Sequence, residues 1–229
     1  MIGYYNYTVI LTYVSLISAS TGIFVSLSGN GHPYVGIIFL MISGMCDAFD
    51  GKVASTNKNR SNDEKLFGIQ IDSLSDLVAF GVLPACIGVS LLKTTHFIDN
   101  IGTLYGNSLK IAAIVVIYLI FVFFVLAGMI RLAYFNVTEC NFLLTAGLPK
   151  KHFTGLPITT SSMIFPTILL IQYFIKTDIT AIFYLFMLIT GIAFIVPFKV
   201  KKPTLKWVLI MIGIGLAELF FIINIFLKC

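Results

Sequence analysis

The chain has 229 residues, of which 58% are hydrophobic and only 11% are charged. A water-soluble domain carries roughly 25% charged residues, so this composition excludes most soluble folds and indicates a protein of the lipid bilayer. The formal net charge of +5 comes from basic residues in short gaps between apolar segments, which is typical of membrane topology and not of a nucleic-acid partner.

Long, continuous apolar segments follow one another along the chain. A helix needs about 20 apolar residues to span a bilayer, whereas a membrane barrel would show alternating segments of roughly ten residues. The predicted fold class is therefore all-α, a polytopic membrane helix bundle that forms one domain over residues 1–229. The seven expected spans are 9–28, 35–54, 69–92, 110–134, 157–175, 179–197 and 205–227.

Basic residues are concentrated in three of the gaps, those after the second, fourth and sixth spans. By the positive-inside rule these gaps face the cytoplasm, which places the N-terminus inside. With seven spans the C-terminus lies outside. If spans five and six instead formed one re-entrant unit, the C-terminus would change sides.

Four of the ten acidic residues crowd into one stretch of 30 residues, each beside or inside an apolar run: Asp47, Asp50, Asp72 and Asp76. A carboxylate deep in a membrane costs about 2.5–3.5 kcal/mol on insertion scales, so four of them require a compensating partner. Spacings of three and four residues put each pair on one helix face. Two adjoining antiparallel helices would direct all four into one pocket, where oxygen ligands suit Mg²⁺ or Mn²⁺.

Small residues accompany the aspartates, since Gly51 and Ala54 follow the first pair and Gly68 precedes the second. They permit close approach of either a neighbouring helix or a nucleotide, and the polar link 55–67 makes the pocket accessible from water. Two other interpretations of the aspartates stay open. In the first, the aspartates are helix-end groups that are protonated or paired with lysine. In the second, they serve a cation transporter as metal ligands or proton relays.

In chain order these residues form the pattern Asp47-x2-Asp50-Gly51-x2-Ala54, followed by Gly68-x3-Asp72-x3-Asp76. The pattern resembles the signature of the CDP-alcohol phosphotransferases, integral membrane enzymes of phospholipid synthesis. Three further segments are similar to the phosphatidylserine synthase branch of that family: 72–85, 131–137 and 153–161.

The sequence departs from the family pattern in two ways. Ser55 stands where the family usually has arginine, and 12 residues separate Ser55 from Gly68 in place of the usual eight. The missing arginine removes one positive charge from the signature. We expect Lys58 or Arg60, in the longer link, to supply that charge as phosphate-binding residues.

The resemblance implies a six-helix core, here residues 1–198, with 205–227 as an extra C-terminal helix, and a homodimer. It implies transfer of the phosphatidyl group from CDP-diacylglycerol to L-serine with release of CMP. The expected partners are these two substrates and membrane lipids, and the expected location is a bacterial plasma membrane with the site facing the cytoplasm. Glycerol phosphate, inositol phosphate or choline are alternative acceptors.

The family's roles can be carried onto matching positions of this chain. They make Asp47, Asp50 and Asp72 the ligands of one or two divalent cations, Mg²⁺ or Mn²⁺. Asp76 completes the cluster and is the expected general base toward the serine hydroxyl. The residues expected beside the nucleotide are Asp47, Gly51, Ala54 and Gly68.

The acceptor requires a partner for its carboxylate. Arg131, at the end of the fourth predicted span, can bind a carboxylate with two parallel hydrogen bonds, and Asn136 is a second candidate. A plain topological anchor is the alternative role for Arg131.

Overall fold

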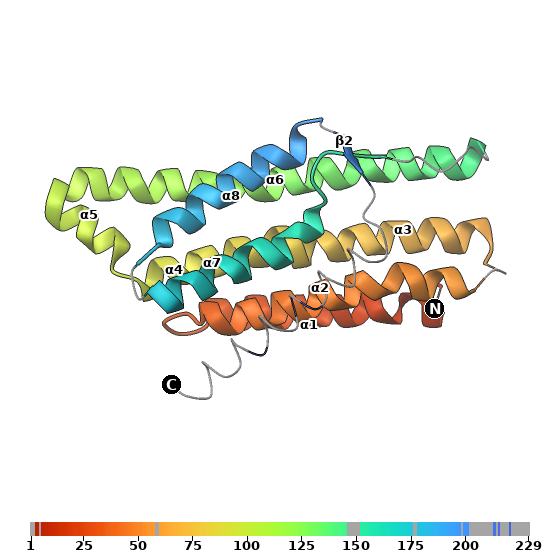
Figure 1. Cartoon of the computed structure of the whole chain (residues 1–229), viewed down its shortest axis with the longest axis horizontal. Coiled ribbons are helices and arrows are strands. Elements are labelled where there is room, and N and C mark those ends of the chain that lie inside the picture. The colour runs from red at the N-terminus through yellow and green to blue at the C-terminus, as the bar shows by residue number, and fades with distance from the viewer. Residues whose placement is uncertain are drawn as a thin grey trace.

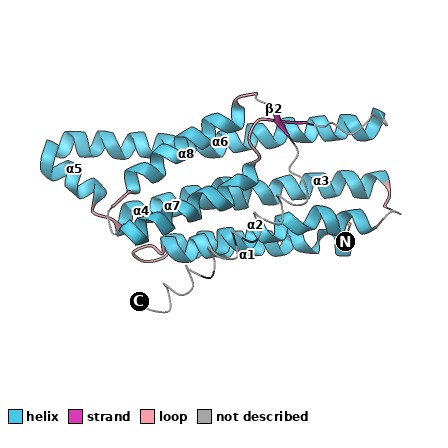
Figure 2. Cartoon of the chain, in the orientation of Figure 1, coloured by secondary structure: helices cyan, strands magenta, loops and turns pink. Residues whose placement is uncertain are grey.

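The computed structural model is a bundle of helices that run along one common long axis (Figure 1). Almost all of the described chain is helical, with one short pair of strands (Figure 2). The predicted all-α membrane bundle is confirmed. The described residues are 3–4, 6–57, 60–145, 152–175, 178–197 and 199–201, with the single positions 213, 215 and 220.

The first two spans pack as a close antiparallel pair. The 3₁₀ turn η1 (Tyr7–Val9) leads directly into α1 (Ile10–Leu27), and α2 (Pro33–Thr56) returns alongside it. Small residues let the two backbones approach, because a Cβ added at Gly22 would lie 2.7 Å from the Cβ of Phe39. Ser18 Oγ donates a hydrogen bond to the carbonyl oxygen of Phe39 at 3.0 Å across this contact.

The third predicted span is one unbroken helical run of three parts. These are α3 (Asn62–Asp76), the π-helical segment η2 (Leu77–Val82) and α4 (Leu83–Thr94). The run starts well before residue 69 because Ser61 caps it reciprocally with Glu64. The π segment begins directly after Asp76 and ends two residues before Pro84, which has no N–H to donate.

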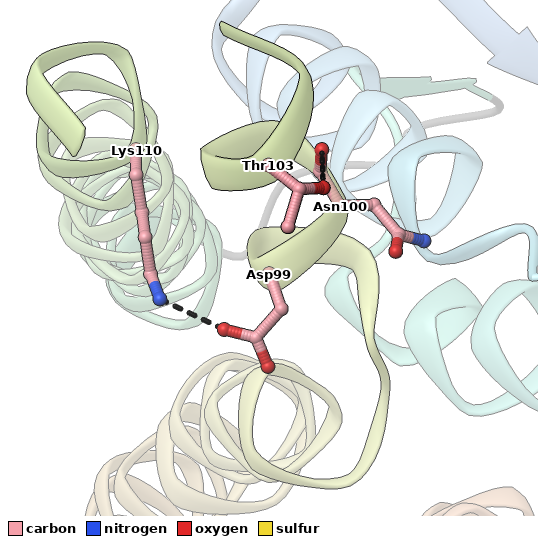
Figure 3. A network of polar contacts seen from close by, with 4 residues as sticks. All are labelled: Asp99, Asn100, Thr103 and Lys110. Atoms are coloured by element: carbon pink, nitrogen blue, oxygen red, sulfur yellow. Dashed lines mark hydrogen bonds and ion pairs between the residues drawn. The ribbon is translucent and has the colours of Figure 1, made fainter. Parts of the chain in front are cut away.

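A short helix that the sequence analysis did not predict, α5 (Phe97–Tyr105), turns the chain toward α6 (Asn107–Thr145). Gly106 makes the turn with a φ of 89°, a conformation that favours glycine. Lys110 Nζ of α6 lies 2.8 Å from Asp99 Oδ1 of α5, and this ion pair fixes the elbow (Figure 3). The lysine lowers the pKa of the exposed Asp99 carboxyl below its usual value.

The helix of the fourth predicted span extends beyond residue 134. Residues 135–145 contain neither glycine nor proline, and α6 continues through them to Thr145. As a consequence Arg131 lies within a helix and not at its end.

The remaining described elements connect the two sides of the bundle. The strands β1 (His152–Thr154) and β2 (Lys199–Lys201) pair antiparallel, with His152 opposite Lys201, and join two of the basic gaps. The sequence analysis did not predict this pair. Between the strands lie η3 (Ile158–Thr160), α7 (Ser161–Ile175) and α8 (Thr180–Ile195).

Helix lengths separate the predicted spans into two groups. Four helical runs are long and apolar enough to cross a membrane, and they correspond to the first four predicted spans. The apolar helices at Ile158–Gln172 and Thr180–Ile195 are shorter. The predicted span 205–227 lies outside the described residues, apart from the single positions named above.

The core sits where the third span meets α6, α7 and α8. In the bundle, α1 and α2 lie along one edge and α6 with α8 along the other, with α3, α4 and α7 between them (Figure 1). Four fully buried phenylalanines fill the centre: Phe80, Phe124, Phe165 and Phe183. This packing holds the helical run that carries Asp72 and Asp76 at a fixed position against its neighbours.

Candidate active site

Two helices bring the four predicted aspartates to one place. Asp47 and Asp50 come from α2, while Asp72 and Asp76 come from α3. Carboxylate oxygens of Asp47, Asp50 and Asp72 all lie within 4.8 Å of one another. Asp76 is 9% exposed, and its carboxyl interacts electrostatically with the carboxyls of Asp47, Asp72 and Asp50. The four side chains therefore form a single acidic cluster.

Such a cluster needs positive charge. Carboxylates this close repel one another strongly, and burial weakens the screening that water would provide. In the part of the chain that the structure describes, no lysine or arginine forms an ion pair with any of the four. A set of oxygen donors with this spacing fits a hard cation. The cluster can therefore bind a metal ion.

A cavity of about 250 Å³ opens beside the cluster. Asp50 and Asp72 form part of its wall, so one side of the cluster faces open space. The other walls come from the start of α1, the end of α2 and the first turns of α3. The lining residues are Thr8, Val9, Thr12, Asp50, Gly51, Ala54, Arg60, Lys65, Gly68, Ile69 and Asp72.

The two glycines of the pattern line this cavity, and packing does not explain them. A Cβ added at Gly51 meets no atom within 4 Å, and one added at Gly68 meets only Arg60 Nη1, at 3.6 Å. Both lie within helices, where glycine costs about 1 kcal/mol relative to alanine. The space above Gly51 is open, which counts against a role for this glycine in helix packing.

The link between α2 and α3 brings positive charge to the same cavity. Arg60 lines it, and its Nε is buried without a hydrogen-bond partner among the described residues. Ser55 is exposed and donates to the carbonyl oxygen of Lys52 at 2.7 Å. Lys58 lies outside the described residues.

The sequence analysis missed Lys65, which also lines the cavity. A signal for it exists, because Lys65 precedes Gly68 by three residues and Asp72 by seven, which is the spacing of a single helix face. It also missed the contribution of the N-terminal turn, where Thr8 and Thr12 form part of the wall. That contribution depends on the packing of α1 against α3 and has no local signal.

Neither predicted acceptor residue lines this cavity. Asn136 ties α6 to α3, since its Oδ1 accepts from Ser73 Oγ at 2.6 Å and its Nδ2 donates to Gln70 Oε1 at 3.3 Å. Arg131 is 8% exposed, and its Nη1 lies 3.1 Å from the position of a Cβ on Gly155. Asn136 therefore lies where α6 contacts α3, and Arg131 lies on α6 beside the segment that contains Gly155.

Comparison with known proteins places this site in a family. The family model described as CDP-alcohol phosphatidyltransferase matches residues 5–217. The chain is similar to the CDP-diacylglycerol–serine O-phosphatidyltransferase of Saccharomyces cerevisiae, with 33% identity over 159 residues, or 65% of this chain and 49% of the relative. It is similar to the archaetidylserine synthase of Methanothermobacter thermautotrophicus, with 32% identity over 151 residues, or 66% of this chain and 53% of the relative.

A more extended match is to the CDP-diacylglycerol–serine O-phosphatidyltransferase of Helicobacter pylori. Identity is 26% over 204 residues, which is 87% of this chain and 73% of the relative. By contrast, the chain spans about half the length of the yeast and archaeal relatives.

Proposed function

The chain belongs to the CDP-alcohol phosphatidyltransferase family, and from this membership we propose that it transfers the phosphatidyl group from CDP-diacylglycerol to L-serine. The products are phosphatidylserine and CMP. The observation that carries the proposal is the acidic cluster that opens on a cavity with unfilled space above Gly51. The names of the relatives support serine as the acceptor.

We assign the aspartates two kinds of role. Asp47, Asp50 and Asp72 are the proposed ligands of Mg²⁺ or Mn²⁺, which would neutralise charge on the diphosphate and on departing CMP. Asp76 is the proposed general base and takes the proton from the serine hydroxyl. The serine oxygen then bonds to the phosphorus that carries diacylglycerol, and the bond from that phosphorus to the bridging oxygen of CMP breaks. A well-placed base contributes about 10²–10⁴-fold to such a step.

The nucleotide is proposed to lie in the cavity beside Gly51, Ala54 and Gly68, with Asp47 also reaching the cytidine. The missing side chains at the two glycines leave room for direct approach to the helix backbone. The cavity also adjoins Asp50 and Asp72. Nucleotide and metal ligands are thus close enough to act on one diphosphate.

Serine is proposed to approach from α6, the helix on which Arg131 and Asn136 lie. The carboxylate of serine would pair with the Arg131 guanidinium, and Asn136 would hold α6 against the helix that carries Asp72 and Asp76. Donor and acceptor would then reach the aspartates from opposite sides. We further propose a homodimer in a bacterial plasma membrane, with the cavity facing the cytoplasm.

The test is CMP release by the purified protein in lipid nanodiscs that contain CDP-diacylglycerol. Serine, glycerol phosphate, inositol phosphate and choline are compared as acceptors, each with Mg²⁺, Mn²⁺ or a chelator. We expect that serine is the only one of the four acceptors that supports CMP release, and that this release requires the metal ion. Release with another acceptor would reassign the substrate, and metal flux into proteoliposomes without nucleotide binding would support the transporter alternative.

A further inference from the structure

We propose that Arg60 and Lys65 form a cationic part of the cavity lining that binds the nucleotide-linked phosphates beside the aspartates. The ligands concerned are the phosphate of CMP and the diphosphate of CDP-diacylglycerol. The inference rests on the proposed function and assigns a phosphate-binding role to two residues that are not part of the family pattern.

The charged side chains that line the cavity suit an anion together with a cation. Arg60 and Lys65 share the cavity with Asp50 and Asp72, yet among the described residues neither base forms an ion pair with either acid. Two positive and two negative side chains thus face the same space of about 250 Å³ without meeting. A phosphate anion with a bound metal ion would pair with both: the phosphate oxygens with the two bases and the metal ion with the two acids.

The Arg60 side chain itself points to an acceptor. Its Nε is buried and has no hydrogen-bond partner among the described residues. A buried N–H without a partner is unfavourable, and a phosphate oxygen is the acceptor that guanidinium groups bind most effectively. Arg60 Nη1 also lies over Gly68, where the absence of a side chain keeps the space open.

The start of α3 fixes both bases in place. Glu64 Oε2 accepts from the backbone N–H of Ser61 at 2.8 Å, and Ser61 Oγ accepts from the backbone N–H of Glu64 at 3.2 Å. Asn6 Nδ2 donates to Glu64 Oε1 at 2.7 Å, which ties the N-terminal segment to this turn. Arg60 directly precedes the cap and Lys65 directly follows Glu64, so the same turn orients both.

This arrangement explains the departure at Ser55. The serine is exposed, its hydroxyl is bonded to its own helix, and it brings no charge to the cavity. The longer link leads instead to Arg60, which enters the cavity beside Gly68. The positive charge of the family pattern is thus retained but comes from a different position.

The test compares equilibrium binding of CMP with that of cytidine, because only CMP carries a phosphate. Arg60→Gln and Lys65→Gln are each compared with wild type in nanodiscs with Mn²⁺ and no lipid substrate. Lys52→Gln is the matched control, since Lys52 lies near the same end of α2, stacks 5.6 Å above the Phe49 ring and does not line the cavity. We expect CMP affinity to fall about tenfold in each cavity variant, as for loss of one charge-assisted hydrogen bond.

Cytidine affinity should stay at the wild-type value in all three variants, which also shows that they are folded. Arg60→Lys should keep most of the CMP affinity because it keeps the charge. The inference is overturned if the cavity variants bind CMP as tightly as wild type, or if CMP and cytidine affinity fall together. Failure of wild type to bind CMP at all would instead overturn the proposed function.

Discussion

An alanine substitution at Gly51 should change the stability and the activity of the protein in opposite directions. In the structure a methyl group at this position meets no neighbour within 4 Å, and the residue lies inside a helix. Gly51→Ala should therefore stabilise the fold by about 0.5–1 kcal/mol through better helix propensity. For a chain of this size that corresponds to a rise in melting temperature of about 1–4 °C.

The same methyl group should impair nucleotide binding. It occupies the wall of the cavity next to Asp50, where the proposed nucleotide approaches the backbone. Filling a well-packed contact with an extra methyl costs about 1–3 kcal/mol, which predicts CMP release reduced by roughly ten- to hundredfold at limiting CDP-diacylglycerol. The variant should thus be more stable and less active.

Gly22→Ala is the matched control. There the added Cβ would lie 2.7 Å from the Cβ of Phe39, an atom close to the α2 backbone that cannot move away easily. This variant should lose stability by about 1–3 kcal/mol from overpacking. Thermal unfolding in nanodiscs and CMP release measure both properties. Unchanged activity of Gly51→Ala, or a loss of its stability like that of Gly22→Ala, would refute a ligand role for the glycine.

Three further predictions concern single side chains. Asp76→Asn should reduce CMP release by at least about 10²-fold at an unchanged unfolding temperature. The control Asp63→Asn, at an exposed position, should leave CMP release unchanged. Normal turnover by Asp76→Asn would rule out Asp76 as the general base. Arg131→Ala should raise the serine KM more than it lowers kcat in steady-state assays, and an unchanged KM would contradict the carboxylate contact. Lys110 lowers the pKa of Asp99, so this pair stabilises the fold fully above about pH 4, and the contribution is lost as the pH falls through the lowered pKa. Below about pH 4 the stability of wild type should therefore depend on pH more steeply than that of Asp99→Asn. Equal slopes would exclude the effect.

Local patterns in the sequence predicted the membrane bundle and the acidic cluster. Apolar segments of about 20 residues have few alternatives to helices in a bilayer, because every backbone polar group needs a partner there. The pairs Asp47 with Asp50 and Asp72 with Asp76 share helix faces by spacing alone, so their direction followed once the helices were predicted. Gly51 and Gly68 were recognisable as small residues beside these pairs, where they allow close approach to the backbone.

The tertiary structure decided the features that depend on contacts between distant segments. Arg131 could not be placed from its own neighbourhood, because α6 continues beyond the predicted end and Gly155 packs against its guanidinium. The pairing of β1 with β2 and the wall contributed by the N-terminal turn join segments whose local sequence carries no sign of the partner. Arg60 is the clearest case: as a link residue it was one of two candidates for a missing charge, and only the cap at Ser61 and the open space at Gly68 decided that its side chain enters the cavity.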